Sequence, residues 1–141
     1  MVLDSLPADV RAPTFLKLDI EGFELHALRG GKAWLSSHRP TYVWMELIPA
    51  LVELSTGSNT AWLGVLSFWF DLEYRVWIPG TDGFEITREM LEEEMNGSSM
   101  IAEALPICSY NLMLSLLPIA EFAVPTGIPL DVCESYGPRT H

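Results

Sequence analysis

The chain has 141 residues and a mass of 15.8 kDa, 49% of its residues are hydrophobic, and its formal net charge is −11. This composition is that of one globular domain, and it excludes a disordered or low-complexity chain. A chain this acidic repels phosphate backbones, which excludes a nucleic-acid-binding protein that depends on counterion release. Residues 1–70 carry 7 acidic and 5 basic side chains, against 12 and 3 in residues 71–141, so we expect the chemistry in the balanced first half.

The pattern of apolar residues predicts alternating strands and helices. Strands are expected over residues 14–20, 42–48, 73–78 and 109–117. Helices are expected over residues 24–37, from Ser58 or Asn59 to about Asp71, and over residues 87–95, where Thr87 would be the cap and Met90, Leu91 and Met95 would face inward. Gly30-Gly31 favours two short pieces as much as one helix over 24–37, Pro49 would end the second strand, and residues 55–60, 79–83 and 118–141 are expected to be irregular.

This order predicts an α/β fold, with about four strands in half of a doubly wound sheet and helices on its faces. The first seven residues lack the basic and apolar regions of a signal peptide. The longest apolar tract, residues 105–124, is interrupted by prolines, an asparagine and a glutamate, so we expect no membrane-spanning helix. Cys108 and Cys133 form neither a zinc pattern nor a disulfide framework. We therefore expect a cytoplasmic protein without a membrane partner.

Three carboxylates surround the predicted end of the first strand, namely Asp19, Glu21 and Glu24. Ligands of open α/β sheets bind outside the carboxyl ends of the strands, and Gly22 allows the sharp turn that would hold these acids near one point. A carboxylate there can orient a polar ligand or accept a proton. Glu46, near the end of the neighbouring strand, could join the same site.

Simpler interpretations of these acids stay open. Asp19 and Glu21 could only cap the following helix, and Glu46 could be a strand-end residue bonded to backbone. A Mg²⁺ or Ca²⁺ site built from Asp19, Glu21 and Glu24 lacks further ligands, so we predict no metal. The histidines have no Ser or Cys at the spacing of a nucleophile elbow, which disfavours a hydrolase.

Several segments together resemble the FkbM-type S-adenosylmethionine-dependent methyltransferases. The similarity lies in residues 15–25 (FLKLDIEGFEL), 28–31 (LRGG) and 39–47 (RPTYVWMEL). Residues 3–6 (LDSL) resemble the short element that precedes them, and residues 110–114 (YNLML) resemble the family's late strand. The resemblance is most specific over residues 3–49.

The resemblance implies a class I methyltransferase fold, which is Rossmann-like. The strands over 14–20 and 42–47 would be its fourth and fifth, and the last two strands would form an antiparallel edge. Family members transfer a methyl group from S-adenosylmethionine, commonly to a hydroxyl oxygen, so the acceptor would be a small molecule or a glycan. The resemblance implies that Asp19 and Glu21 lie beside the transferring methyl group, and we add Glu46 as a third catalytic candidate.

The chain also departs from the family pattern. In the family a Gly-rich turn after the first strand helps to bind the cofactor, no such segment precedes Leu3, and Gly30-Gly31 lies in the wrong place. We therefore interpret residues 1–141 as a single partial domain that is inactive in isolation. The alternative is a non-enzymatic remnant or interaction module that keeps the sheet. A missing neighbour would leave residues 14–20 as an exposed sheet edge, which predicts self-association.

Overall fold

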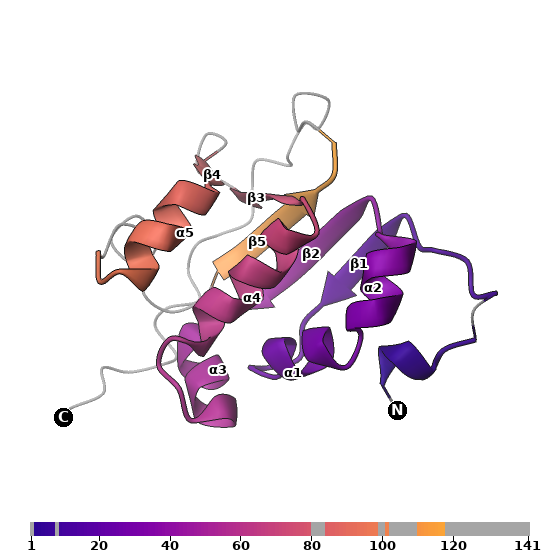
Figure 1. The fold of residues 1–141 in the computed structure, drawn as a ribbon, viewed down its shortest axis with the longest axis horizontal. Coiled ribbons are helices and arrows are strands. Elements are labelled where there is room, and N and C mark those ends of the chain that lie inside the picture. The colour runs from indigo at the N-terminus through magenta and orange to yellow at the C-terminus, as the bar shows by residue number, and fades with distance from the viewer. Residues whose placement is uncertain (1, 8, 80–83, 99–100, 102–109, 118–141) are drawn as a thin grey trace.

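The computed structural model describes residues 2–7, 9–79, 84–98, 101 and 110–117. Figure 1 shows the elements in chain order. They are the 3-10 helix η1 (Leu3–Ser5), β1 (Phe15–Leu18), α1 (Glu24–Arg29), α2 (Lys32–His38), β2 (Tyr42–Leu47), α3 (Pro49–Thr56), α4 (Ala61–Asp71), β3 (Arg75–Ile78), β4 (Phe84–Ile86), α5 (Arg88–Met95) and β5 (Tyr110–Ser115).

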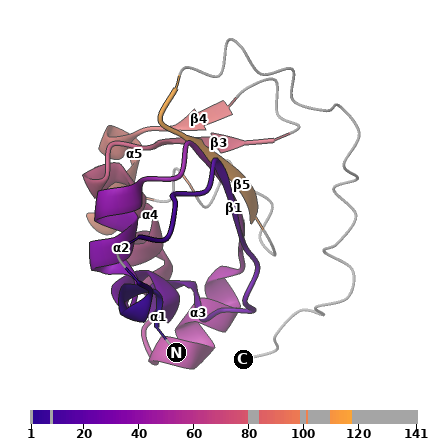
Figure 2. The same ribbon diagram turned by 90° about the vertical axis from the view of Figure 1, so that its right-hand side faces the viewer.

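The strands form one mixed sheet in the order β1-β2-β5-β3-β4. β1 and β2 are parallel, and the other pairs are antiparallel. The expected α/β class is confirmed, as is the antiparallel pairing of the strands predicted over 73–78 and 109–117, here β3 and β5. In Figure 2, α1, α2, α4 and α5 lie on the same side of the sheet. The second helical layer of a doubly wound fold stays a prediction.

The core lies between that helical layer and the sheet. Alternate residues of β2, namely Val43, Met45 and Leu47, are fully buried, whereas their neighbours are half-buried. This alternation follows from the two-residue period of a strand, which places successive side chains on opposite faces. The apolar helix α4 contributes Leu66 and Trp69 to the same core. The other face of the sheet therefore carries the half-buried residues of β2.

Local sequence signals account for some of the element boundaries. Of the two alternatives left open at Gly30-Gly31, the structure has the two short helices, since α1 ends at Arg29 and α2 begins at Lys32. The predicted cap of α5 is confirmed as well, because the Oγ1 of Thr87 accepts a hydrogen bond of 3.3 Å from the backbone N–H of Met90.

Other predictions about the elements were wrong. β2 ends before Pro49, as predicted, but the helix that follows was not predicted: Pro49 is the first residue of α3, where the fixed φ of proline suits a helix start, and α3 extends into the turn expected over residues 55–60. Helix α4 begins after Thr60, without the side-chain cap that we expected from Ser58 or Asn59. β4 was not predicted and makes five strands instead of four. Met95 was expected to face inward and is half exposed.

The structure leaves several predictions untested. Cys108, Cys133, most of the 79–83 loop and the tail over residues 118–141 lie outside the described residues. Within the described part of the chain, no helix has the length and apolar character needed to cross a membrane.

Candidate functional site

The acidic segment forms a sharp turn between the carboxyl end of β1 and α1. The backbone N–H of Phe23 donates to the carbonyl of Ile20 at 3.2 Å and closes the turn. The two residues between them have φ angles of 54° (Glu21) and 92° (Gly22). Positive φ at both central positions is the pattern of a type I′ turn, which glycine adopts freely and glutamate does not. Asp19 and Glu21 therefore lie at a strand terminus, as predicted.

The three acids of this segment differ in their surroundings. Asp19 pairs with Lys17, whereas the exposed Glu21 has no hydrogen bond or ion pair among the described residues. Glu24 is only 1% exposed, and its Oε1 accepts a hydrogen bond of 3.1 Å from the backbone N–H of Gly22. The N-cap residue of α1, Phe23, makes no side-chain cap hydrogen bond, and the interpretation of Asp19 and Glu21 as acids that only favour the helix N-terminus stays untested.

The three acids are not arranged as a group of metal ligands among the described residues. In residues 2–79 and the other described ranges, no group of three or more His, Cys, Asp or Glu side chains could hold a metal ion. The buried carboxylate of Glu24 is committed to the turn, which removes it from the set of three ligands that we considered.

Lys17 and Asp19 form an ion pair on the face of the sheet opposite to the core. The Lys17 Nζ lies 2.9 Å from the Asp19 Oδ2. Lys17 is opposite Trp44 of β2 in register, whereas the next residue, Leu18, is buried. The hydrogen bond and charge of Asp19, together with the charge of Glu46, raise the pKa of Lys17 above its ordinary value. Lys17 therefore remains a cation between two carboxylates.

Glu46 is brought to the same end of the sheet by the pairing of β1 with β2. It is the next-but-one residue after Trp44, so it shares a face with Lys17, and its register partner in β5 is Asn111. The structure thus groups Asp19 and Glu46 with Lys17, which the sequence analysis did not select. An i, i+2 pair of opposite charges at a strand end was the signal that could have identified Lys17.

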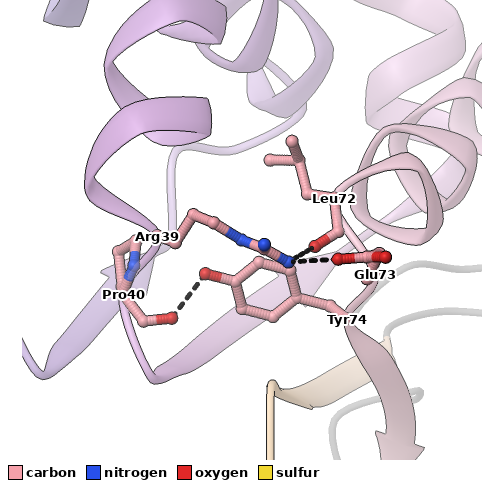
Figure 3. Close-up of polar contacts among 5 residues, drawn as sticks. All are labelled: Arg39, Pro40, Leu72, Glu73 and Tyr74. Atoms are coloured by element: carbon pink, nitrogen blue, oxygen red, sulfur yellow. Dashed lines mark hydrogen bonds and ion pairs between the residues drawn. The ribbon is translucent and has the colours of Figure 1, made fainter.

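Arg39 and Pro40, a conspicuous motif of the predicted family, serve the fold at the opposite end of β2. Figure 3 shows the Arg39 Nη2 donating to the carbonyl of Leu72 and to the Glu73 Oε2, the second contact at 3.1 Å. The hydroxyl of buried Tyr74 donates to the carbonyl of Pro40. These contacts, here called the Arg39 clamp, join the turn before β2 to the turn before β3.

Residues 3–6, the other conspicuous motif, also have a structural role. The two carboxylate oxygens of Asp4 accept hydrogen bonds from the backbone N–H groups of Ala33 (3.3 Å) and Trp34 (2.8 Å), at the start of α2. A Cβ on Gly31 would lie 2.7 Å from the Leu3 side chain, so glycine allows η1 to approach. Asp4 therefore caps α2 from a distance.

Comparison with known proteins gives one match. The model of the family described as the methyltransferase FkbM domain matches residues 2–93, which include β1, the acidic turn, the Arg39 clamp and β2. Neither a curated protein nor a solved structure matches the chain.

Proposed function

The chain belongs to the FkbM methyltransferase family, and we propose that its acidic turn binds the hydroxyl-bearing acceptor of a methyl transfer from S-adenosylmethionine. The observation that carries this proposal is the group formed by Lys17, Asp19 and Glu46 at the carboxyl ends of β1 and β2. Ligands of open α/β sheets bind at this end of the strands. The side chain of Asp19 is 35% exposed, so a ligand can reach its carboxylate.

Asp19 is the proposed proton acceptor. When an acceptor hydroxyl becomes a methyl ether, the new bond between its oxygen and the methyl carbon would replace the bond from that carbon to the sulfonium sulfur of S-adenosylmethionine, which keeps the electron pair, and the hydroxyl proton must leave. A carboxylate within hydrogen-bond reach of the hydroxyl can take that proton. Lys17 orients the carboxylate through its ion pair. Glu21 and Glu46 offer further carboxylate oxygens, which can accept hydrogen bonds from a substrate with several hydroxyls. These hydrogen-bond acceptors support a small polyhydroxylated molecule or a glycan as the methyl acceptor.

The cofactor does not fit the described residues as a complete site. The adjacent glycines that could form a phosphate- or nucleotide-binding turn, Gly30 and Gly31, are covered by Val2 and Leu3. A Cβ would lie 3.1 Å from the Val2 side chain at Gly30, and closer still to Leu3 at Gly31, so a ligand finds no room there. We therefore assign no cofactor-binding residue, and the isolated chain is proposed to be inactive.

The class I methyltransferase fold is proposed on the order of the strands. The parallel pair β1-β2 is followed by the antiparallel strands β5 and β3. This supports the assignment of β1 and β2 as the fourth and fifth strands of that fold, in a partial domain.

Asp19→Asn tests the proposed base, with Asp9→Asn, an exposed acid outside the helices and strands, as the control. Transfer of labelled methyl from S-adenosylmethionine to a panel of glycans and small polyols is measured with the full-length protein. We expect Asp19→Asn to lower transfer about 100-fold or more, the scale of general-base catalysis, with little loss of stability because the ion pair is exposed. The variant should also lower the pKa of Lys17 in NMR titrations. Unchanged transfer would remove Asp19 from the mechanism.

A further inference from the structure

The turn that carries Glu21 is held by residues that do not belong to it. Both backbone polar groups of Gly22 bond to side chains from helices: its N–H donates to the Glu24 Oε1 at 3.1 Å, and its carbonyl accepts from the Ser55 Oγ at 2.6 Å. Helix α3 also touches the turn directly, because a Cβ on Gly22 would lie 2.5 Å from the backbone carbon of Leu51. The turn is thus fixed from α1 and from α3.

A second contact joins the same two helices beside the turn. The Nε2 of His26 in α1 lies 3.3 Å from the carbonyl oxygen of Ser55 in α3. Ser55 therefore contacts the turn through its hydroxyl and α1 through its backbone. Since α3 follows β2 directly, its position is coupled to the strand that carries Glu46.

The backbone conformation of Glu21 is the reason that the turn needs such support. A non-glycine residue at a φ of 54° is sterically disfavoured, and an exposed side chain without a folded-state partner does not offset that cost. The turn would relax to an extended or right-handed shape unless neighbouring groups opposed it. Glu24 contributes to this support, since it is buried at 1% exposure and its Oε1 accepts the hydrogen bond from the backbone N–H of Gly22.

We propose that Ser55 and Glu24 are positioning residues, which hold the left-handed turn so that the carboxylate of Glu21 faces the acceptor. The role of Glu21 toward the acceptor rests on the proposed function, whereas the contacts that hold the turn do not. Helix α3 is then a part of the site, although none of its side chains has to touch the substrate. Loss of the Ser55 hydroxyl should release the turn while the sheet stays intact.

Amide hydrogen exchange of the whole chain, followed by NMR, tests the geometry. The N–H groups of Gly22 and Phe23 report on the turn, and the N–H of Met45 in the core strand β2 reports on global unfolding. We expect Ser55→Ala to accelerate exchange at the two turn amides about fivefold, the effect of one hydrogen bond, without an equal change at Met45.

Two variants separate positioning from a general loss of stability. Ser55→Thr keeps the hydroxyl and should restore slow exchange. Glu21→Gly removes the disfavoured residue and should slow exchange at the turn. Ser36→Ala is the matched control, because its Oγ makes a comparable bond of 2.7 Å to the carbonyl of Lys32 within α2, away from the turn. Unchanged turn exchange in Ser55→Ala, or a rise that Ser55→Thr does not reverse, would overturn the proposal.

A kinetic measurement separates this inference from the proposed function. If both hold, Ser55→Ala lowers kcat for methyl transfer and leaves the KM for S-adenosylmethionine unchanged, and Ser55→Thr restores kcat. If the wild-type protein and every variant lack transfer in the assay used for Asp19→Asn, but turn exchange responds as expected, the proposed function fails and the geometric role of Ser55 stands. If transfer is present and insensitive to Ser55→Ala, the positioning role is wrong.

Discussion

The contact between the acidic turn and α3 gives a prediction whose magnitude can be worked out from the structure. Replacing Gly22 by alanine has two costs. The first is conformational, because alanine is disfavoured at a φ of 92°, by about 1 kcal/mol. The second is steric, because the new Cβ would lie 2.5 Å from the Leu51 backbone carbon, which cannot rotate away. Overpacking of this kind costs about 1–3 kcal/mol, so we expect a total loss of about 3 kcal/mol.

Gly97 provides a matched control for this prediction. Its φ is also 92°, but no atom of the described residues lies within 4 Å of the position that a Cβ would occupy. Gly97→Ala should therefore show the conformational cost alone, about 1 kcal/mol. Free energies of unfolding from urea titrations of both variants give the difference, which measures the steric contact with α3. If Gly22→Ala is no more destabilising than Gly97→Ala, the close approach of α3 to the turn is wrong.

Two further predictions concern the Arg39 clamp and the sheet edge. Burial raises the pKa of Tyr74 to about 12, with the charge of Arg39 opposing, so the folded protein retains a proton that the unfolded chain loses above about pH 10. The resulting stability is present below pH 10, and about 2 kcal/mol of it is lost as the pH rises to about 12. Urea titrations of Tyr74→Phe over this pH range should not show the loss. β1 is an edge strand among the described residues, and Phe15 is half exposed, so the isolated chain should self-associate in sedimentation and Phe15→Lys should weaken this. A stable monomer would contradict that prediction.

Elements with a strong local pattern could be predicted from the sequence. The buried alternation of Val43, Met45 and Leu47 marks β2, and the same logic locates β1 and β3. The Thr87 cap and the break at Gly30-Gly31 are likewise properties of a few neighbouring residues. The position of Asp19 at a strand terminus follows from the same reasoning, because a run of apolar residues ends where the polar turn begins.

Features that depend on distant residues could not be predicted. Pro49 both ends an extended segment and starts a helix, and the sequence alone does not decide between these roles. The spacing of Lys17 and Asp19 was a local signal, but the grouping of Lys17 with Glu46 depends on the pairing of β1 with β2. The burial of the Glu24 side chain could not be predicted either. It results from the packing of α1 and not from the spacing between Glu24 and Asp19.

The residues with a left-handed backbone differ in the contacts that their side chains make. Among the described non-glycine residues, φ is positive at Glu21, Arg39 and Glu73. Arg39 and Glu73 pair with each other in the clamp, so their side chains stabilise the folded state that strains them. Glu21 has no such pair and depends on Ser55 and Gly22 for its conformation. The strain at Glu21 is thus opposed by neighbouring groups and not by its own side chain, which leaves its carboxylate available to the acceptor that we propose.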